Sequence, residues 1–173
     1  MKDPHHQDPI DLLGEVYEKM YESTADNLHK AEEKSGPALH KLIDEAKDEA
    51  VKLKKVSAED GEKLAEWLKR DMDDTIHYLK DSGHELKDWL GFETTLLETG
   101  FLDLMLKAAD KTTLELMELK ERIEKASTYH TGEITGPGTL ICDQCGEKLH
   151  FHKTGKIPPC PKCHATTFHR KSR

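Results

Sequence analysis

Four cysteines arranged as two CxxC pairs constrain this chain more than any other feature of its sequence. The first pair is Cys142 and Cys145, the second is Cys160 and Cys163, and fourteen residues separate the pairs. Two such pairs at this separation are typical of a zinc site, because each CxxC turn directs two thiolates at one ion and two turns complete a tetrahedron. The sequence therefore predicts that these cysteines bind one zinc ion.

A shell of four thiolates leaves no coordination position for water, so we expect a structural metal and not a hydrolytic centre. A rubredoxin-like iron site would use the same ligands and stays open as an alternative. A thioredoxin-like redox motif is disfavoured because no βαβ pattern surrounds either pair. Four histidines lie near the cysteines, and since the thiolates already fill the shell we expect them on the surface: His150, His152, His164 and His169.

Short strand-like segments flank the cysteines and predict a small β ribbon. They cover residues 139–141, 148–152 and 166–170. His164 follows the second pair at a position where ribbons commonly carry glycine, so we expect a strained left-handed turn there. The segment has little apolar surface and should fold only with metal. Metal loss should therefore unfold residues 139–170 and leave the helical content of the chain nearly unchanged.

The rest of the chain is rich in charge and poor in apolar side chains. Hydrophobic and charged residues each make up 35% of the chain, whereas an average globular protein is about 45–50% apolar and about 25% charged. Long helices with narrow apolar stripes fit this balance better than a thick α/β core. We predict a mostly α protein, with an elongated helical hairpin or bundle followed by a small C-terminal β zinc ribbon.

Apolar residues recur at spacings of three and four, which predicts five helical segments. They cover residues 11–34, 38–55, 58–81 after an N-cap at Ser57, 85–109 and 112–125. Trp67 and Trp89 lie on apolar stripes and are expected in the core. In the run from Lys69 to Asp74 two basic residues are followed by three aspartates, so we interpret it as a mixed-charge face. The predicted division is a disordered tail (1–9), an acidic, coiled-coil-like helical domain (10–126) and a four-cysteine zinc ribbon (127–173).

Charge is distributed unevenly between these parts. Residues 126–173 carry seven Lys or Arg against three Asp or Glu, a balance of +4, whereas residues 1–125 carry nineteen against thirty-one, a balance of −12. The acidic helices would repel nucleic acid, but the basic ribbon could contact it. Opposite charges would also permit the ribbon to dock on the helices. The candidate partner contacts are Lys148, Phe151, Lys153, Lys156, Lys162, Phe168 and Arg170, with Lys171 and Arg173 beyond them.

Several function classes find no support in the sequence. It contains no Ser-His-Asp signature, phosphate loop or dinucleotide fingerprint. Asp26 with His29, and Asp74 with His77, have a spacing related to that of di-iron bundles, but with so many charged residues we attribute both pairs to chance. No apolar run approaches the roughly 18 residues of a membrane span, and the polar start shows no secretory signal. We therefore expect a cytoplasmic protein.

The segments around the cysteines resemble a known family. Residues 129–133 (YHTGE), residues 136–140 (GPGTL) and the two CxxC pairs are similar to the bacterial zinc-ribbon-containing proteins of the YbeL-like family. These are small proteins of Gram-negative bacteria with an acidic helical part and a C-terminal ribbon. The resemblance implies the same architecture and the same four cysteine ligands, and it implies no activity.

These features together predict a non-enzymatic zinc-binding protein. The ribbon would dock a protein partner, and the acidic helices would act as a spacer or as an element of homo-oligomerisation. The alternative is binding to nucleic acid, a ribosome or the transcription machinery through the basic ribbon.

Overall fold

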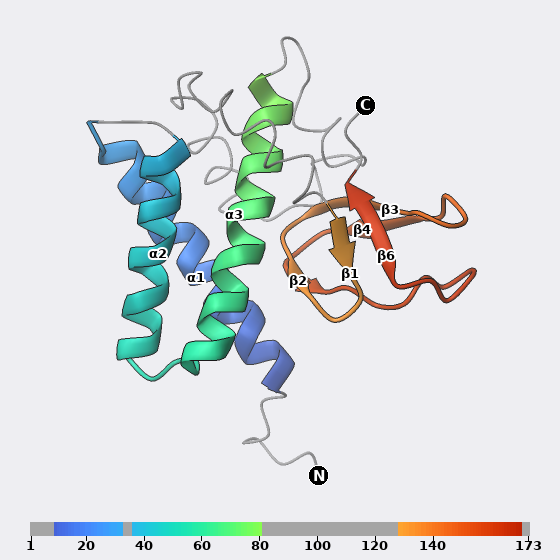
Figure 1. Ribbon diagram of the computed structural model, residues 1–173, viewed down its shortest axis with the longest axis horizontal. Helices are drawn as coiled ribbons and strands as arrows, with labels where there is room; N and C mark the ends of the chain where they lie inside the picture. The colour runs from blue at the N-terminus through green and yellow to red at the C-terminus, as the bar shows by residue number, and fades with distance from the viewer. Residues whose placement is uncertain (1–8, 33–35, 81–127, 171–173) are drawn as a thin grey trace.

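The computed structural model describes residues 9–32, 36–80 and 128–170. In Figure 1, α2 and α3 stand side by side, α1 crosses behind them, and the strand-rich C-terminal part lies on the α3 side. The helices are α1 (Pro9–Lys30), α2 (Gly36–Lys52) and α3 (Ala58–Lys80), and the strands are β1 (Thr128–His130), β2 (Ile134–Thr135), β3 (Gly138–Cys142), β4 (Lys148–Phe151), β5 (Gly155–Lys156) and β6 (Thr167–Arg170).

Three of the predicted helices are thus confirmed, with boundaries shifted by a few residues. The two later predicted helices, Trp89, the disordered tail up to residue 8 and the domain boundary near residue 127 all lie outside the described residues. Within the described helices, none is long and apolar enough to cross a membrane.

Local side-chain chemistry sets the helix ends. Ser57 caps α3 as predicted, because its Oγ accepts a hydrogen bond from the backbone N–H of Asp60 at 3.1 Å and donates one to the Asp60 carboxylate at 3.0 Å. The chain leaves α2 through Lys54, whose φ of 55° is left-handed. The N–H of Lys55 then bonds to the carbonyl of Ala50 at 3.0 Å, which closes the last turn of α2.

Apolar faces of the three helices form one core. The predicted stripes are confirmed for Tyr17, Leu28, Leu39, Ile43, Leu64 and Leu68, which are each 0–1% exposed. Leu53, expected at the end of the stripe of residues 38–55, is an exception, since it is 58% exposed beyond the last residue of α2. Trp67 packs against this core while remaining partly exposed. Burial of a large apolar side chain stabilises a fold by roughly 1.5–3 kcal/mol, so these contacts hold the bundle together.

The C-terminal part contains two antiparallel sheets. The larger has the order β1-β6-β3-β4, and β2 pairs with β5 in a separate two-stranded sheet. In the larger sheet Cys142 lies opposite Phe168, and Leu140 lies opposite Arg170. Side chains alternate along β6, with Phe168 and Arg170 buried and His169 exposed. We call residues 128–170 the ribbon.

The ribbon packs directly on the helices, through contacts of β2 with α1 and α3 and of β5 with α1. Ile134 of β2 belongs to the same apolar cluster as the helical core. On the helix side, Arg70 and Asp71 are only 7% and 3% exposed. Asp73 is 8% exposed, but it faces α2, where its carboxylate lies 2.7 Å from Nε2 of His40. The interpretation of residues 69–74 as a mixed-charge face was therefore wrong for these three residues, because the ribbon covers Arg70 and Asp71 and α2 covers Asp73.

Candidate metal centre

Two turns of the same construction hold the four cysteines. In the first, the N–H of Gly146 bonds to the carbonyl of Cys142 at 3.0 Å and the N–H of Cys142 bonds to the carbonyl of Glu147 at 2.9 Å. In the second, the N–H of His164 bonds to the carbonyl of Cys160, and the N–H of Cys160 bonds to the carbonyl of Ala165, both at 2.9 Å. Each CxxC therefore forms a closed knuckle that presents both of its sulfurs on one side.

Both knuckles need a left-handed residue after the second cysteine. Gly146 fills this position in the first knuckle with a φ of 71°, and His164 fills it in the second with a φ of 60°. Glycine adopts this conformation without steric cost, whereas other residues do so at about 1–2 kcal/mol. The predicted strained turn at His164 is confirmed.

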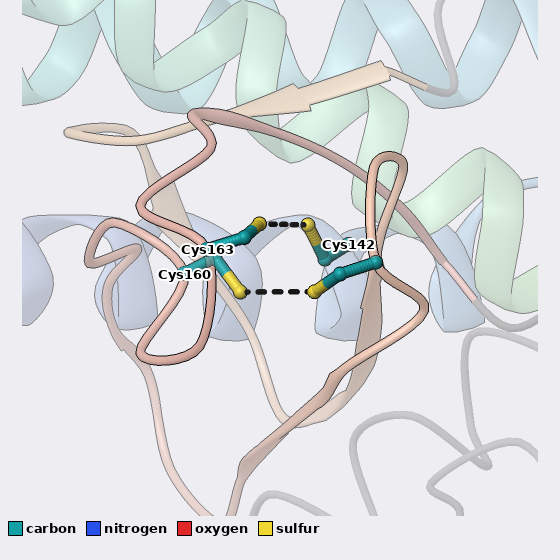
Figure 2. A group of neighbouring side chains, drawn as sticks. Cys142, Cys160 and Cys163 are labelled. Atoms are coloured by element: carbon teal, nitrogen blue, oxygen red, sulfur yellow. Dashed lines mark hydrogen bonds between the residues drawn. The ribbon is translucent and has the colours of Figure 1, made fainter.

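The four sulfurs converge between the knuckles. Figure 2 shows Cys142, Cys160 and Cys163 pointing into the same space, with dashed lines marking two sulfur pairs that each join one knuckle to the other. The Sγ atoms of Cys142 and Cys163 lie 3.6 Å apart, and those of Cys145 and Cys160 lie 3.5 Å apart. All four ligand atoms lie within 4.8 Å of one another. The two cysteine pairs are thus brought together as the sequence predicted.

These distances fit a metal centre better than a disulfide centre. Four sulfurs at about 2.3 Å from one tetrahedral ion lie roughly 3.8 Å from each other, close to the separations seen here. A disulfide would need about 2.05 Å between sulfurs, and all four cysteines are free. The residues therefore fit an ion held by four thiolates, with no ligand position left for water.

The surroundings of the sulfurs affect how readily they ionise. Burial raises the pKa of Cys160, but the backbone N–H groups of Cys163 and Lys162 outweigh it and lower that pKa to about 7. The N–H of Glu147 lowers the pKa of Cys145, whereas burial and the neighbouring cysteines together raise it to about 12. Closely packed thiols resist losing all their protons, so a cation at the centre is the natural replacement for those protons.

The nearby histidines lie around the site and not in it. His150, His152, His164 and His169 are all exposed. The Nδ1 of His169 lies 2.6 Å from the carboxylate of Asp143, which links β6 to the first knuckle. Among the residues that the structure describes, three or more His, Cys, Asp or Glu side chains come close enough to share one ion only at these four cysteines. Within that part of the chain, Asp26 and Asp74 do not join such a group.

The predicted partner contacts divide into two sets. Lys148, Lys153, Lys156 and Lys162 are exposed, and Phe151 is partly exposed. Phe168 and Arg170 are 0% and 4% exposed, so neither can meet a phosphate or a base in this fold. The prediction is corrected for these two residues, because both are buried on β6, one of the two inner strands of the larger sheet. Lys171 and Arg173 lie outside the described residues.

Sequence reasoning missed the buried polar residues that join the ribbon to α3, chiefly Asp71 and Arg70. A signal was present in the helical spacing. Leu68 follows Leu64 by four residues and Asp71 follows Leu68 by three, so Asp71 lies on the same stripe as the two leucines. A charged residue on an apolar stripe is expected to be paired when it is buried. Its partner, Arg170, is distant in the sequence, and no local pattern connects the two.

Comparisons with known proteins agree with this site. A family described as a zinc-ribbon containing domain matches residues 26–172. Three curated relatives from Escherichia coli (strains K12, CFT073 and O157:H7) are each named "Uncharacterized protein YbeL" and are 24% identical over 162 residues, which covers 94% of this chain and 98% of each relative. No solved structure matches the chain. Since the family covers most of the sequence, including all four cysteines, the chain belongs to the zinc-ribbon containing domain family.

Proposed function

We propose that this is a non-enzymatic zinc-binding protein whose ribbon docks a protein partner. The observation that carries the zinc assignment is the convergence of four sulfurs within 4.8 Å. Soft thiolate ligands in a tetrahedral arrangement favour zinc or iron, and zinc suits a closed structural shell. One ion per chain would fix both knuckles and stabilise the ribbon.

The docking role is supported by the exposed lysines of the ribbon. Lys148 begins β4 and Lys153 lies two residues after its end, and both are exposed, as are Lys156 and Lys162. Lys162 has a counter-charge in Glu147, with 3.9 Å between Nζ and Oε2. Such a surface suits an acidic protein partner in the cytoplasm. The acidic helices would act as a spacer or pair with a second copy of the chain.

The alternative function is binding of nucleic acid, or of a ribosome or transcription complex, through the same lysines. The exposed positive charge favours it, since phosphate contacts need only lysine or arginine. The burial of Phe168 and Arg170 weighs against it, because those residues would have supplied stacking and a bidentate phosphate contact.

A pulldown with the full-length protein from its own cell lysate, divided into nuclease-treated and untreated halves, separates these functions. Specific proteins that stay bound after nuclease would support protein docking. Ribosomes or nucleic acid that nuclease removes would support the alternative, as would an affinity that falls steeply with salt. Metal analysis of the same preparation should give one zinc per chain, and iron in its place would overturn the zinc assignment.

A matched pair of double variants tests whether the lysines of the ribbon form the partner-binding surface. Lys148→Glu with Lys153→Glu reverses the charge beside β4, whereas Lys41→Glu with Lys63→Glu makes the same change on exposed positions of the helices. Only the first double variant should lose the bound partner. Equal loss in both would show that overall charge governs binding, and not the ribbon surface.

A further inference from the structure

A buried polar network joins the ribbon to the helices, and its centre is Asp71 of α3. Asp71 Oδ2 accepts hydrogen bonds from the hydroxyl of Tyr17, the hydroxyl of Thr135 at 3.1 Å and the backbone N–H of Gly136 at 3.0 Å. Its Oδ1 lies 3.2 Å from Nε of Arg70 and 3.7 Å from Nη2 of Arg170. We call Asp71 and the residues that contact it, Tyr17, Arg70, Thr135, Gly136 and Arg170, the Asp71 network.

Three of these five partners belong to the ribbon. Thr135 and Gly136 come from β2 and the turn after it, and Arg170 is the last residue of β6. A carboxylate that is 3% exposed needs such donors and counter-charges, because a buried charge without partners is strongly destabilising. The helices therefore depend on the ribbon for three of the five partners of Asp71.

The guanidinium of Arg170 is fixed by the ribbon itself. It donates from Nη1 to the carbonyl of Pro137 at 3.0 Å, from Nη2 to the hydroxyl of Thr135 at 2.6 Å and from Nε to the hydroxyl of Tyr129 at 3.0 Å. Gly138 gives it room, since a Cβ there would lie 2.0 Å from Nη1. The ribbon thus holds Arg170 in the position that Asp71 requires.

A second set of contacts crosses the same interface, and in this set the helix supplies the cation and the ribbon supplies the anion. Arg70 of α3 pairs with Glu133 of the ribbon, and its guanidinium carbon lies 3.7 Å from the centre of the Tyr129 ring. The Tyr129 hydroxyl donates to the Asp74 carboxylate at 2.5 Å. Each side of the interface therefore supplies a cation and an anion, which favours one specific docked arrangement.

The metal ligands lie close to these contacts along the strands. β3 ends at Cys142, which lies opposite Phe168, and two residues further along β6 is Arg170. The apolar core of the ribbon has eight buried residues, and two of them are the ligands Cys142 and Cys160. So small a core cannot keep β3 and β6 in register once the ligands are released.

We propose that the four-cysteine site and the Asp71 network are energetically coupled, so that metal occupancy controls whether the ribbon stays docked on α1 and α3. Metal release frees β6, withdraws Arg170 from Asp71 and exposes the face of α1 and α3 that carries Tyr17 and Asp71. Metal availability thereby changes the surface of the helices as well as the folding of the ribbon. This effect goes beyond the sequence-based expectation that metal loss unfolds the ribbon and leaves the helical content nearly unchanged. The inference rests on the proposed metal binding and is independent of the docking partner.

Hydrogen exchange on the full-length protein tests the coupling. Amides of α3 residues 64–75 should exchange about tenfold faster or more after removal of the metal by excess chelator under reducing conditions, and returning zinc should restore protection. Unchanged exchange in α3, with faster exchange confined to the ribbon, would overturn the proposal. Metal analysis before and after chelation keeps the two proposals distinct, because a chain that holds no metal fails the proposed function itself.

The coupling between metal binding and docking acts in both directions, and this allows a second measurement. If metal stabilises docking, then loss of docking must weaken metal binding by the same factor. Asp71→Asn should reduce zinc affinity roughly fivefold or more in competition with a chromophoric chelator, whereas Asp48→Asn, an exposed aspartate on α2, should not. Equal zinc affinity in all three proteins would overturn the proposal. If Asp71→Asn does not fold, the exchange experiment on the unmodified chain decides alone.

Discussion

Arg170 of β6 and Asp71 of α3 face each other across the interface between the ribbon and the helices. Nη2 of Arg170 lies 3.7 Å from Oδ1 of Asp71, and the side chains are 3% and 4% exposed. The same arginine is held by ribbon groups on its other donors. One buried cation thus links the folding of the ribbon to the stability of the bundle, which leads to specific predictions.

Asp71→Asn should destabilise the folded protein by about 3 kcal/mol or more, because it leaves Arg70 and Arg170 buried without their shared counter-charge. Urea unfolding followed by far-UV circular dichroism measures this change. The same substitution at exposed Asp48 serves as the control and should leave stability unchanged. A loss below about 1 kcal/mol would show that the buried cations are compensated elsewhere.

Gly138→Ala should be much more damaging than Gly146→Ala. At Gly138 the new methyl group would lie 2.0 Å from Nη1 of Arg170, so the guanidinium must leave its site. At Gly146 nothing lies within 4 Å, and the cost is only the left-handed backbone, about 1–2 kcal/mol. Thermal unfolding of both variants with zinc present measures the difference. Similar midpoints would mean that Arg170 moves at little cost.

His164→Val should lower the stability of the metal-loaded protein, whereas His164→Gly should preserve or raise it. The φ of 60° at His164 disfavours a β-branched side chain and suits glycine. We expect the two variants to differ by about 1–2 kcal/mol, as measured by thermal unfolding with zinc present. The order should reverse if the second knuckle does not need a left-handed residue.

Asp74 should make stability fall as pH rises between about 4 and 6. Burial raises the pKa of this carboxyl to about 6, against the opposing effects of the Tyr129 hydroxyl and of Arg170. The folded state therefore binds the proton more tightly than the unfolded state, and this contribution to stability is lost as pH rises through the folded pKa.

Comparison with Asp74→Asn isolates this effect, because metal loss at low pH acts on both proteins. The unfolding free energy of the unmodified protein relative to the variant should be lower at pH 7 than at pH 5. A relative stability that increases with pH would contradict the raised pKa, and one that does not change would place the carboxylate in a solvated setting.

Much of the fold follows from local patterns. The apolar spacing predicted α1 to α3 within a few residues, because each helix buries a stripe whose period is set by the helix itself. Ser57 was identified as a cap from its own residue type and from Asp60 three positions later. The later predicted helices and the boundary near residue 127 are outside the described residues, so they stay predictions.

The sequence by itself determined the metal site, since the CxxC spacing and the left-handed position after each pair are local properties of two short turns. Only the tertiary structure decided which charged residues are surface residues. Phe168 and Arg170 look like partner contacts in the sequence, and Arg70 and Asp71 look like a solvated face, yet all four are buried. Their burial depends on the packing of β6 and α3, which are far apart in the chain, and no local pattern carries that information.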